Sequence, residues 1–130
     1  MIRSLFKKIF FKKDDKYKER LEEFYRLLEK GINSFKTKNF QKAEVYFLMA
    51  IKLDGNRFEG HFNLAILYYD WDYVDKAMES FEKALAIKPE HDECYLYLGK
   101  CYKKKKQAER AYRYIKKAAS LGNKEAQEIL

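Results

Sequence analysis

Small apolar residues recur along this sequence at a fixed spacing of 34 residues. Three separate series show it: Ala43, Ala77 and Ala111; Ala50, Ala84 and Ala118; and Gly31, Ala65 and Gly99. Larger residues keep the same register, because Phe47, Phe81 and Ile115 each follow the first alanine series by four positions. The shared period predicts that one structural unit is repeated along the chain.

Each unit is predicted to be a pair of helices joined by a short break. The breaks fall near Lys38, Asp72 and Lys106, and Asp72 is the expected N-cap of the helix that follows it. The small residues are expected where two helices cross closely, since a larger side chain would push the helices apart. A single Pro and five Gly also favour long helices with short loops. The predicted units span 24–57, 58–91 and 92–125.

This pattern resembles the tetratricopeptide repeat, in which Leu-Gly, Tyr, Ala, Phe and Pro stand at set offsets. The middle unit matches best, through Leu64, Ala65, Tyr68, Ala77, Phe81, Ala84 and Pro89. The third unit departs from the pattern at Asn123, and the first departs at Lys30, Ser34 and Gly55. The resemblance implies an all-α, right-handed α-solenoid of about seven helices, whose core forms between stacked repeats. Residues 126–130 are then expected to begin a capping helix.

The resemblance also implies a binding surface, because the first helix of each repeat in that family lines a concave groove. Carried onto this sequence, the groove combines aromatic and aliphatic residues with lysines at one end. The predicted lining residues are Tyr25, Leu28, Ile32, Phe35, Phe62, Asn63, Ile66, Tyr69, Leu96, Tyr97, Lys100, Lys103 and Lys104. An exposed apolar patch of this size indicates a contact site, although packing against a neighbouring helix is the alternative for any single residue.

One subclass of the family binds chaperones by clamping a peptide's terminal carboxylate with Lys, Asn and Arg at set positions. Here only Asn63 matches, while the other positions hold Leu28, Ile32, Glu93 and Tyr97. Asn63 also fits the general repeat pattern, so it is no evidence for a clamp. We therefore expect a scaffold that binds a peptide or an amphipathic helix, and not a carboxylate-clamp adaptor.

Residues 1–13 form a basic segment ahead of the repeats. Its apolar residues recur at helical spacing, and they are Ile2, Leu5, Phe6, Ile9 and Phe10. The segment holds five basic residues and no acidic one, in a chain whose net charge is +8. A helix of about 12 residues needs a surface to fold on. Three surfaces remain open: an anionic membrane, the protein's own groove, or the groove of a neighbouring molecule.

Asp14 and Asp15 are an expected helix start, which leaves a break of only a few residues after this segment. So short a linker favours docking onto a second molecule, and hence a homo-oligomer, over folding back within one chain. A peripheral membrane adaptor anchored through residues 1–13 is the alternative function, and a free tail is the remaining possibility.

Patterns of catalytic or metal chemistry are absent from the sequence, which has no phosphate loop, zinc spacing or nucleophile elbow. Cys94 and Cys101 stand about 10 Å apart on one predicted helix, too far for a disulfide. Free thiols suit a reducing compartment, so we expect a cytoplasmic protein, with the inner face of a membrane as the alternative. The lysines at 103–106 can reach phosphates, but a solvated loop explains them better than nucleic acid does. The sequence thus predicts a protein-interaction scaffold with no enzymatic activity, cofactor or metal.

Overall fold

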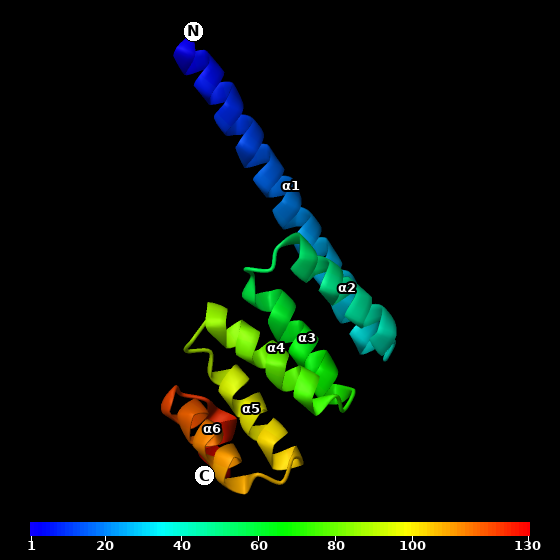
Figure 1. Ribbon diagram of the computed structural model, residues 1–130, viewed down its shortest axis with the longest axis vertical. Coiled ribbons are helices and arrows are strands. Elements are labelled where there is room, and N and C mark those ends of the chain that lie inside the picture. Colours follow the sequence, from blue (N-terminus) through cyan, green and yellow to red (C-terminus); the bar gives the residue numbers. More distant parts are fainter.

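The computed structural model describes residues 1–130, except for the side chain of Phe11. Its elements are α1 (Ile2–Lys36), α2 (Phe40–Leu53), α3 (Phe58–Asp70), α4 (Val74–Ile87), α5 (Asp92–Lys104), α6 (Ala108–Ser120) and α7 (Lys124–Ile129). No strand occurs among the residues described, and the helices follow one another as a stack of antiparallel pairs (Figure 1). The predicted all-α repeat fold is therefore confirmed.

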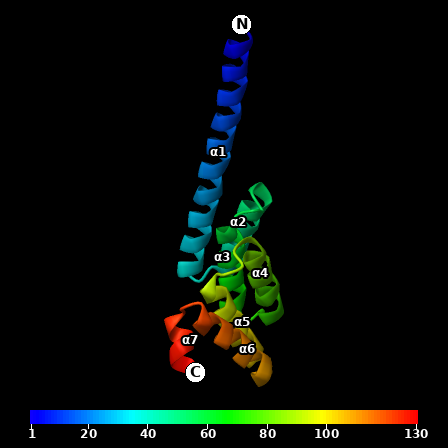
Figure 2. The same cartoon turned by 90° about the vertical axis from the view of Figure 1, so that its left-hand side faces the viewer.

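The helices pack in chain order, first within each pair and then between pairs. α1 lies against α2, α3 against α4 and α5 against α6, while α2 contacts α3 and α4 contacts α5. Phe24, Phe47 and Phe81 are buried along this stack, and burying one such ring stabilises the folded chain by roughly 1.5–3 kcal/mol. The short α7 packs on α6 beside the last pair (Figure 2).

The three series of small residues lie at the helix crossings. Every member of the three series is buried. A Cβ atom added to Gly31 would meet the ring of Phe47, and one added to Gly99 would lie 2.6 Å from Cγ1 of Ile115. The crossing helices therefore leave no room for a larger side chain, which explains why these positions recur with the repeat.

Each turn between paired helices contains one residue in the left-handed backbone region. Lys38, Asp72 and Lys106 have φ angles of 62°, 64° and 59°, and they stand one repeat apart. In the middle turn, the amide of Tyr73 donates to the carbonyl of Tyr68 at 2.8 Å, and equivalent bonds close the other two turns. Asp72 was expected to cap α4, but Tyr73 holds the N-cap position. Asp72 instead supplies the left-handed conformation, which Asp adopts more readily than most residues.

The first helix is longer than the sequence suggested. The break expected at Asp14 and Asp15 is wrong, because α1 runs without interruption over 35 residues, about 52 Å at the helical rise. No Gly or Pro precedes Gly31 in the chain, and Asp14 pairs with Lys18 one turn later at 3.9 Å. Two adjacent acids are therefore not enough to end a helix that its neighbours favour.

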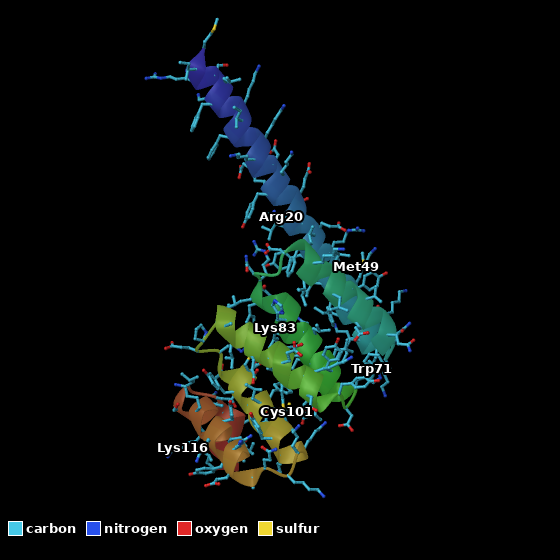
Figure 3. All side chains as sticks on the ribbon, viewed as in Figure 1. Arg20, Met49, Trp71, Lys83, Cys101 and Lys116 are labelled. Atoms are coloured by element: carbon cyan, nitrogen blue, oxygen red, sulfur yellow. The ribbon has the colours of Figure 1, made fainter. Side chains whose placement is uncertain are left out.

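The N-terminal part of α1 projects away from the other helices (Figure 1). Every side chain described between residues 1 and 20 is exposed, and α1 extends into open space beyond Arg20 (Figure 3). Residues 2–16 are called the N-terminal arm below. None of the described helices combines the length and hydrophobicity that crossing a lipid bilayer requires.

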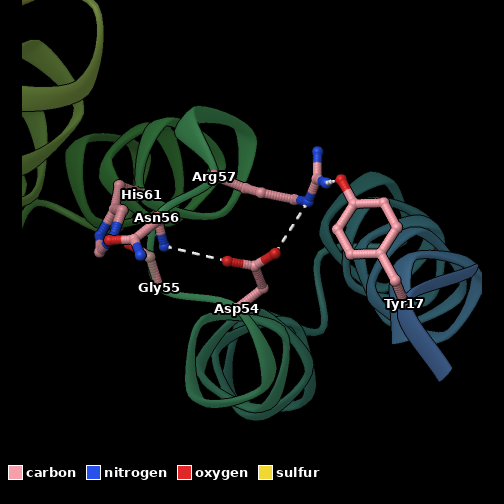
Figure 4. Close-up of polar contacts among 6 residues, drawn as sticks. All are labelled: Tyr17, Asp54, Gly55, Asn56, Arg57 and His61. Carbon is pink, nitrogen blue, oxygen red and sulfur yellow. Dashed lines mark hydrogen bonds and ion pairs between the residues drawn. The ribbon is translucent and has the colours of Figure 1, made fainter. Parts of the chain in front are cut away.

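A polar network holds the base of this arm to the loop between α2 and α3 (Figure 4). Arg57 donates through Nη2 to the hydroxyl of Tyr17 at 2.8 Å and through Nε to Asp54 at 3.0 Å. Its guanidinium also lies over the rings of Phe24 and Tyr25, about 6 Å from each centroid. The direction of the arm follows from the packing of the continuous α1 on α2 and α3, and Arg57 adds a polar contact at the base of the arm.

Candidate protein-binding surface

Two of the predicted groove residues belong to the protein interior. Leu28 is 6% exposed and Leu96 is 3% exposed. Leu96 packs in a cluster with Ile115, Ala118 and Ala126. The position that they share in the repeat faces neighbouring helices. The prediction that these two side chains line a binding surface is therefore wrong.

Phe62 occupies the same position in the middle repeat and is also part of the packing. Its ring stacks on Phe58 at 5.2 Å and meets Phe81 and His91 edge-on at 6.1 and 5.1 Å. Lys88 covers the Phe58 ring at 4.7 Å. These contacts join α3, α4 and the start of α5, which makes Phe62 a structural residue.

The residues predicted for the first repeat divide between packing and exposure. Phe35 stacks on Phe40 at 5.7 Å, and Phe40 in turn contacts Trp71 at 5.8 Å. Phe35 therefore packs within the first repeat, and Phe40 makes the contact with the second repeat. Tyr25 is 42% exposed, and Ile32 is partly buried.

Tyr97 of α5 contacts Tyr69 of α3 and lies close to Glu125 of α7. Its ring stacks on the buried Phe81 at 5.3 Å and meets Tyr69 edge-on at 5.3 Å. Tyr69, Tyr97 and Ile66 are all partly buried, so each keeps one part exposed. We call this area the Tyr97 surface, and it consists of Tyr69, Asp70, Glu93, Tyr97, Lys100 and Glu125.

Carboxylates gather around Tyr97. Burial raises the pKa of the Tyr97 hydroxyl, the nearby Lys100 lowers it, and the charges of Asp70, Glu93 and Glu125 raise it further. Lys100 pairs with Glu125 at 2.7 Å. Burial alone would lower the pKa of Lys100, but the Glu125 carboxylate raises it above its ordinary value.

The other two carboxylates of the Tyr97 surface have no such partner. Asp70 and Glu93 are exposed, and they form no ion pair with any of the side chains described. Lys100 lies 5.2 Å from the centroid of the Tyr97 ring and Lys104 lies 3.9 Å from that of the Tyr69 ring. Even with these two ammonium groups, the surface has an excess of negative charge, because Lys100 pairs with Glu125 and Lys104 with Asp72. Such a surface favours a cationic ligand and disfavours an anionic one.

The lysines predicted as a cluster at one end of the groove are separated in the structure. Lys100 is neutralised by Glu125. Lys104 donates to Asp72 at 3.4 Å and to the carbonyl of Tyr69 at 3.3 Å. Lys103 instead lines a depression bordered by Tyr112, Ile115, Ile129 and Leu130. Two of these three lysines are therefore paired with carboxylates, and the third lies at a different depression.

Asn63 is committed to the backbone of its own helix. Its Nδ2 atom donates to the carbonyl of Glu59 at 2.8 Å. One of the two N–H donors of the Asn63 amide is therefore used within its own helix. Glu59 and Glu93 stand one repeat apart, so they occupy equivalent places on successive repeats and extend the acidic character towards α1.

The two thiols are buried, and their environment disfavours the reactive thiolate form. Burial, with nearby Glu93 and Asp92, raises the pKa of Cys94 to about 12, and burial raises the pKa of Cys101 to about 11. Both cysteines are free. Among the residues described, no group of three His, Cys, Asp or Glu side chains is placed to hold a metal ion.

Comparison with solved structures identifies the class of fold to which this arrangement of helices belongs. The Arabidopsis OM64 TPR domain is 25% identical, with a TM-score of 0.79 over 84% of this chain and 92% of that one. The first TPR of Spaghetti (RPAP3), bound to an HSP90 peptide, is 21% identical, with a TM-score of 0.78 over 84% of this chain and 88% of that one. The chain is therefore a tetratricopeptide-type repeat protein, and this fold is a protein-interaction scaffold.

A bacterial structure gives the same fold at lower identity. It is the Yersinia enterocolitica type III secretion chaperone SycD in complex with a peptide of the translocator YopD. It is 16% identical, with a TM-score of 0.74 over 81% of this chain and 82% of that one.

Sequence comparison gives a narrower result. A family model described as regulator of microtubule dynamics protein 1-3 matches residues 72–129. The match covers α4 to α7 and leaves out α1, α2 and α3. Comparison with curated protein sequences gives no match.

Proposed function

We propose that the protein is a non-enzymatic interaction scaffold whose Tyr97 surface binds a basic amphipathic helix or peptide. The observation that carries this proposal is the pairing of partly exposed rings with unpaired carboxylates. Tyr69 and Tyr97 offer apolar area, and Asp70 and Glu93 stand beside them without cationic partners among the described side chains. A ligand with alternating apolar and basic residues satisfies both features at once.

The same charges speak against a peptide held by its terminal carboxylate. A carboxylate placed beside Tyr97 would approach Glu93 and Asp70, and like charges at close range cost binding energy. The lysines that could offset this repulsion already contact Glu125 and Asp72. The ligand we propose is therefore recognised along its length and not at its C-terminus.

The structural neighbours support a peptide as the ligand class. RPAP3 and SycD are each seen with a bound peptide. Identity to both is too low to transfer the bound sequence, so the ligand proposed here follows from the charges of this chain.

The test uses two synthetic helices with the same apolar residues, one carrying Lys and the other Glu at the polar positions. Fluorescence anisotropy should show binding of the Lys helix at least tenfold tighter than the Glu helix, about 1.4 kcal/mol. The variant D70K/E93K should lose this preference, because both substituted residues are exposed and their charges are reversed.

The matched control is E82K/E109K, which makes the same charge change at exposed positions on α4 and α6. It should bind the Lys helix as the unmodified chain does. Equal binding of the two helices, or equal loss in both variants, would contradict the proposal.

A further inference from the structure

The apolar face of the N-terminal arm points in the same direction as the core face of α1. Phe6 and Phe24 are 18 residues apart, as are Ile9 and Leu27, and 18 residues are about five turns of helix. Phe24 and Leu27 are buried against the repeats, whereas Phe6 and Ile9 are 69% and 50% exposed. The arm thus continues the stripe that packs on α2 and α3, beyond the point where those helices end (Figure 2).

This direction is incompatible with a membrane as the surface beneath the arm. A helix that lies on a bilayer turns its apolar face into the lipid. Because the repeats pack on that same side of the continuous α1, they would be driven into the bilayer. Docking onto the molecule's own Tyr97 surface is excluded as well, since the arm runs straight away from the repeats.

What remains is a protein partner that packs on the arm from the side of the repeats. Such a partner must accept an apolar face and five basic residues with no acid between positions 1 and 13. The Tyr97 surface has the complementary properties, with exposed aromatic area and unpaired Asp70 and Glu93. Charge complementarity of this kind selects partners and fixes orientation.

We infer that the arm of one molecule docks on the Tyr97 surface of a second copy. This inference rests on the proposed function, because it names the ligand of that surface. The two contacting regions differ, so a pair of molecules joined by a single such contact leaves one arm and one Tyr97 surface unoccupied. A contact of this type adds further copies head to tail unless the geometry closes a ring.

Two variants separate the two halves of the contact. In F6A/I9A the arm loses apolar area while alanine maintains the helix. In D70K/E93K the Tyr97 surface reverses its charge. All four residues are exposed, so the fold is retained.

Light scattering measures the mean mass of the full chain over a range of concentrations. The mean mass of the unmodified protein should rise with concentration from 15.7 kDa, the mass of one chain, to at least twice that value. Each variant alone should stay at one chain. An equimolar mixture of the two should form pairs and stop there, because only one productive contact exists between the intact arm and the intact surface.

Matched controls change the opposite faces. S4A/K18A alters the other side of α1, and E82K/E109K alters α4 and α6. Both should associate as the unmodified chain does. A synthetic peptide of residues 1–17 should compete with association.

Three results would overturn the inference. In the first, the unmodified chain keeps the mass of a single chain, yet it still binds the Lys helix and loses this binding in D70K/E93K. The proposed function would then hold without the contact between copies. The second is association of D70K/E93K equal to that of the unmodified chain, which would mean that arms pair with arms. The third is a single-chain protein that sediments with phosphatidylserine-containing vesicles and loses this in F6A/I9A, which would assign the arm to a membrane.

Discussion

The ammonium group of Lys104 lies 3.9 Å from the centroid of the Tyr69 ring. This contact joins the end of α5 to the end of α3, and the same lysine reaches Asp72 in the turn that follows α3. One side chain therefore ties two successive repeats together at the edge of the Tyr97 surface.

Lys104→Met should destabilise the fold by about 0.5–1 kcal/mol, the usual value of a cation–π contact at an exposed site. The methionine keeps the length of the side chain and loses its charge. Urea denaturation followed by circular dichroism measures the change. Lys103→Met is the matched control, since Lys103 is exposed and lines a different depression. Equal changes in unfolding free energy for the two substitutions would mean that the contact between Lys104 and the Tyr69 ring does not stabilise the fold.

Ala77→Leu should destabilise the fold by about 1–3 kcal/mol, because it overpacks a close helix crossing. Ala77 is fully buried at the contact within the second repeat. The melting temperature should fall, whereas Ala86→Leu on the exposed side of the same helix should leave it nearly unchanged. An unchanged melting temperature for Ala77→Leu would contradict the assigned register of the repeat.

Phe62→Ala should cost about 3 kcal/mol or more in unfolding free energy, as truncation of a packed ring does. The sequence placed Phe62 in a binding groove, where its loss would spare the fold. The structure surrounds it with Phe58, Phe81 and His91, so partial unfolding is expected. If Phe62→Ala left the denaturation curve unchanged and weakened binding of the Lys helix, Phe62 would be a binding residue and not a structural one.

The two buried thiols predict a loss of stability at alkaline pH. Their pKa values are raised from 9.0 to about 12 for Cys94 and about 11 for Cys101. A group whose pKa is raised in the folded state stabilises that state below the unfolded pKa, and this stabilisation is lost as pH rises towards the folded pKa. The melting temperature should therefore fall as pH rises from about 9 to about 12.

Cys94→Ala with Cys101→Ala should make that pH dependence shallower, although the partly buried Tyr97 contributes in the same direction. In the native chain at neutral pH, a thiol reagent should label both cysteines slowly, and denaturant should make labelling fast. Rapid labelling of the folded protein would show that the thiols are more accessible than their burial indicates.

Arg57→Ala should loosen the base of the arm without unfolding the repeats. The substitution removes the hydrogen bond to Tyr17, the pair with Asp54 and the contacts with the Phe24 and Tyr25 rings. Amide exchange in residues 14–21 should become faster, while exchange in α4 and α5 stays the same. Arg110→Ala is the control, because its side chain contacts Gln107 and Tyr102 at the other end of the stack. Unchanged exchange near Tyr17 would mean that helix propensity alone holds the arm.

The sequence predicted the helices well because spacing alone encodes them. Ala43, Ala77 and Ala111 recur with the helix crossings, where they are buried and where the short distance between the helices requires a small side chain. The binding surface was harder to predict, since a shared position can be filled by contacts from another repeat. Leu96 is covered by residues of α6 and α7, and nothing in its own helix shows this.

Charge partners were equally hidden from the sequence. Lys100 and Lys104 read as free cations until Glu125 and Asp72 were found beside them, and these partners lie in other segments of the chain. Asp72 itself was predicted as a cap because Asp is common there. The turn requires a left-handed residue at that place, and this demand is stronger than the preference for capping.

The unbroken α1 also makes the molecule a lever. The arm extends about 22 Å beyond its fulcrum at Tyr17, so a tilt of about 10° at the Arg57 contact would displace the tip by about 4 Å. A small movement of the loop between α2 and α3 is thereby magnified at Phe6. Conversely, a force on the tip of the arm acts on that loop as a larger force. Whatever grips the arm is mechanically coupled to the junction of the first two repeats.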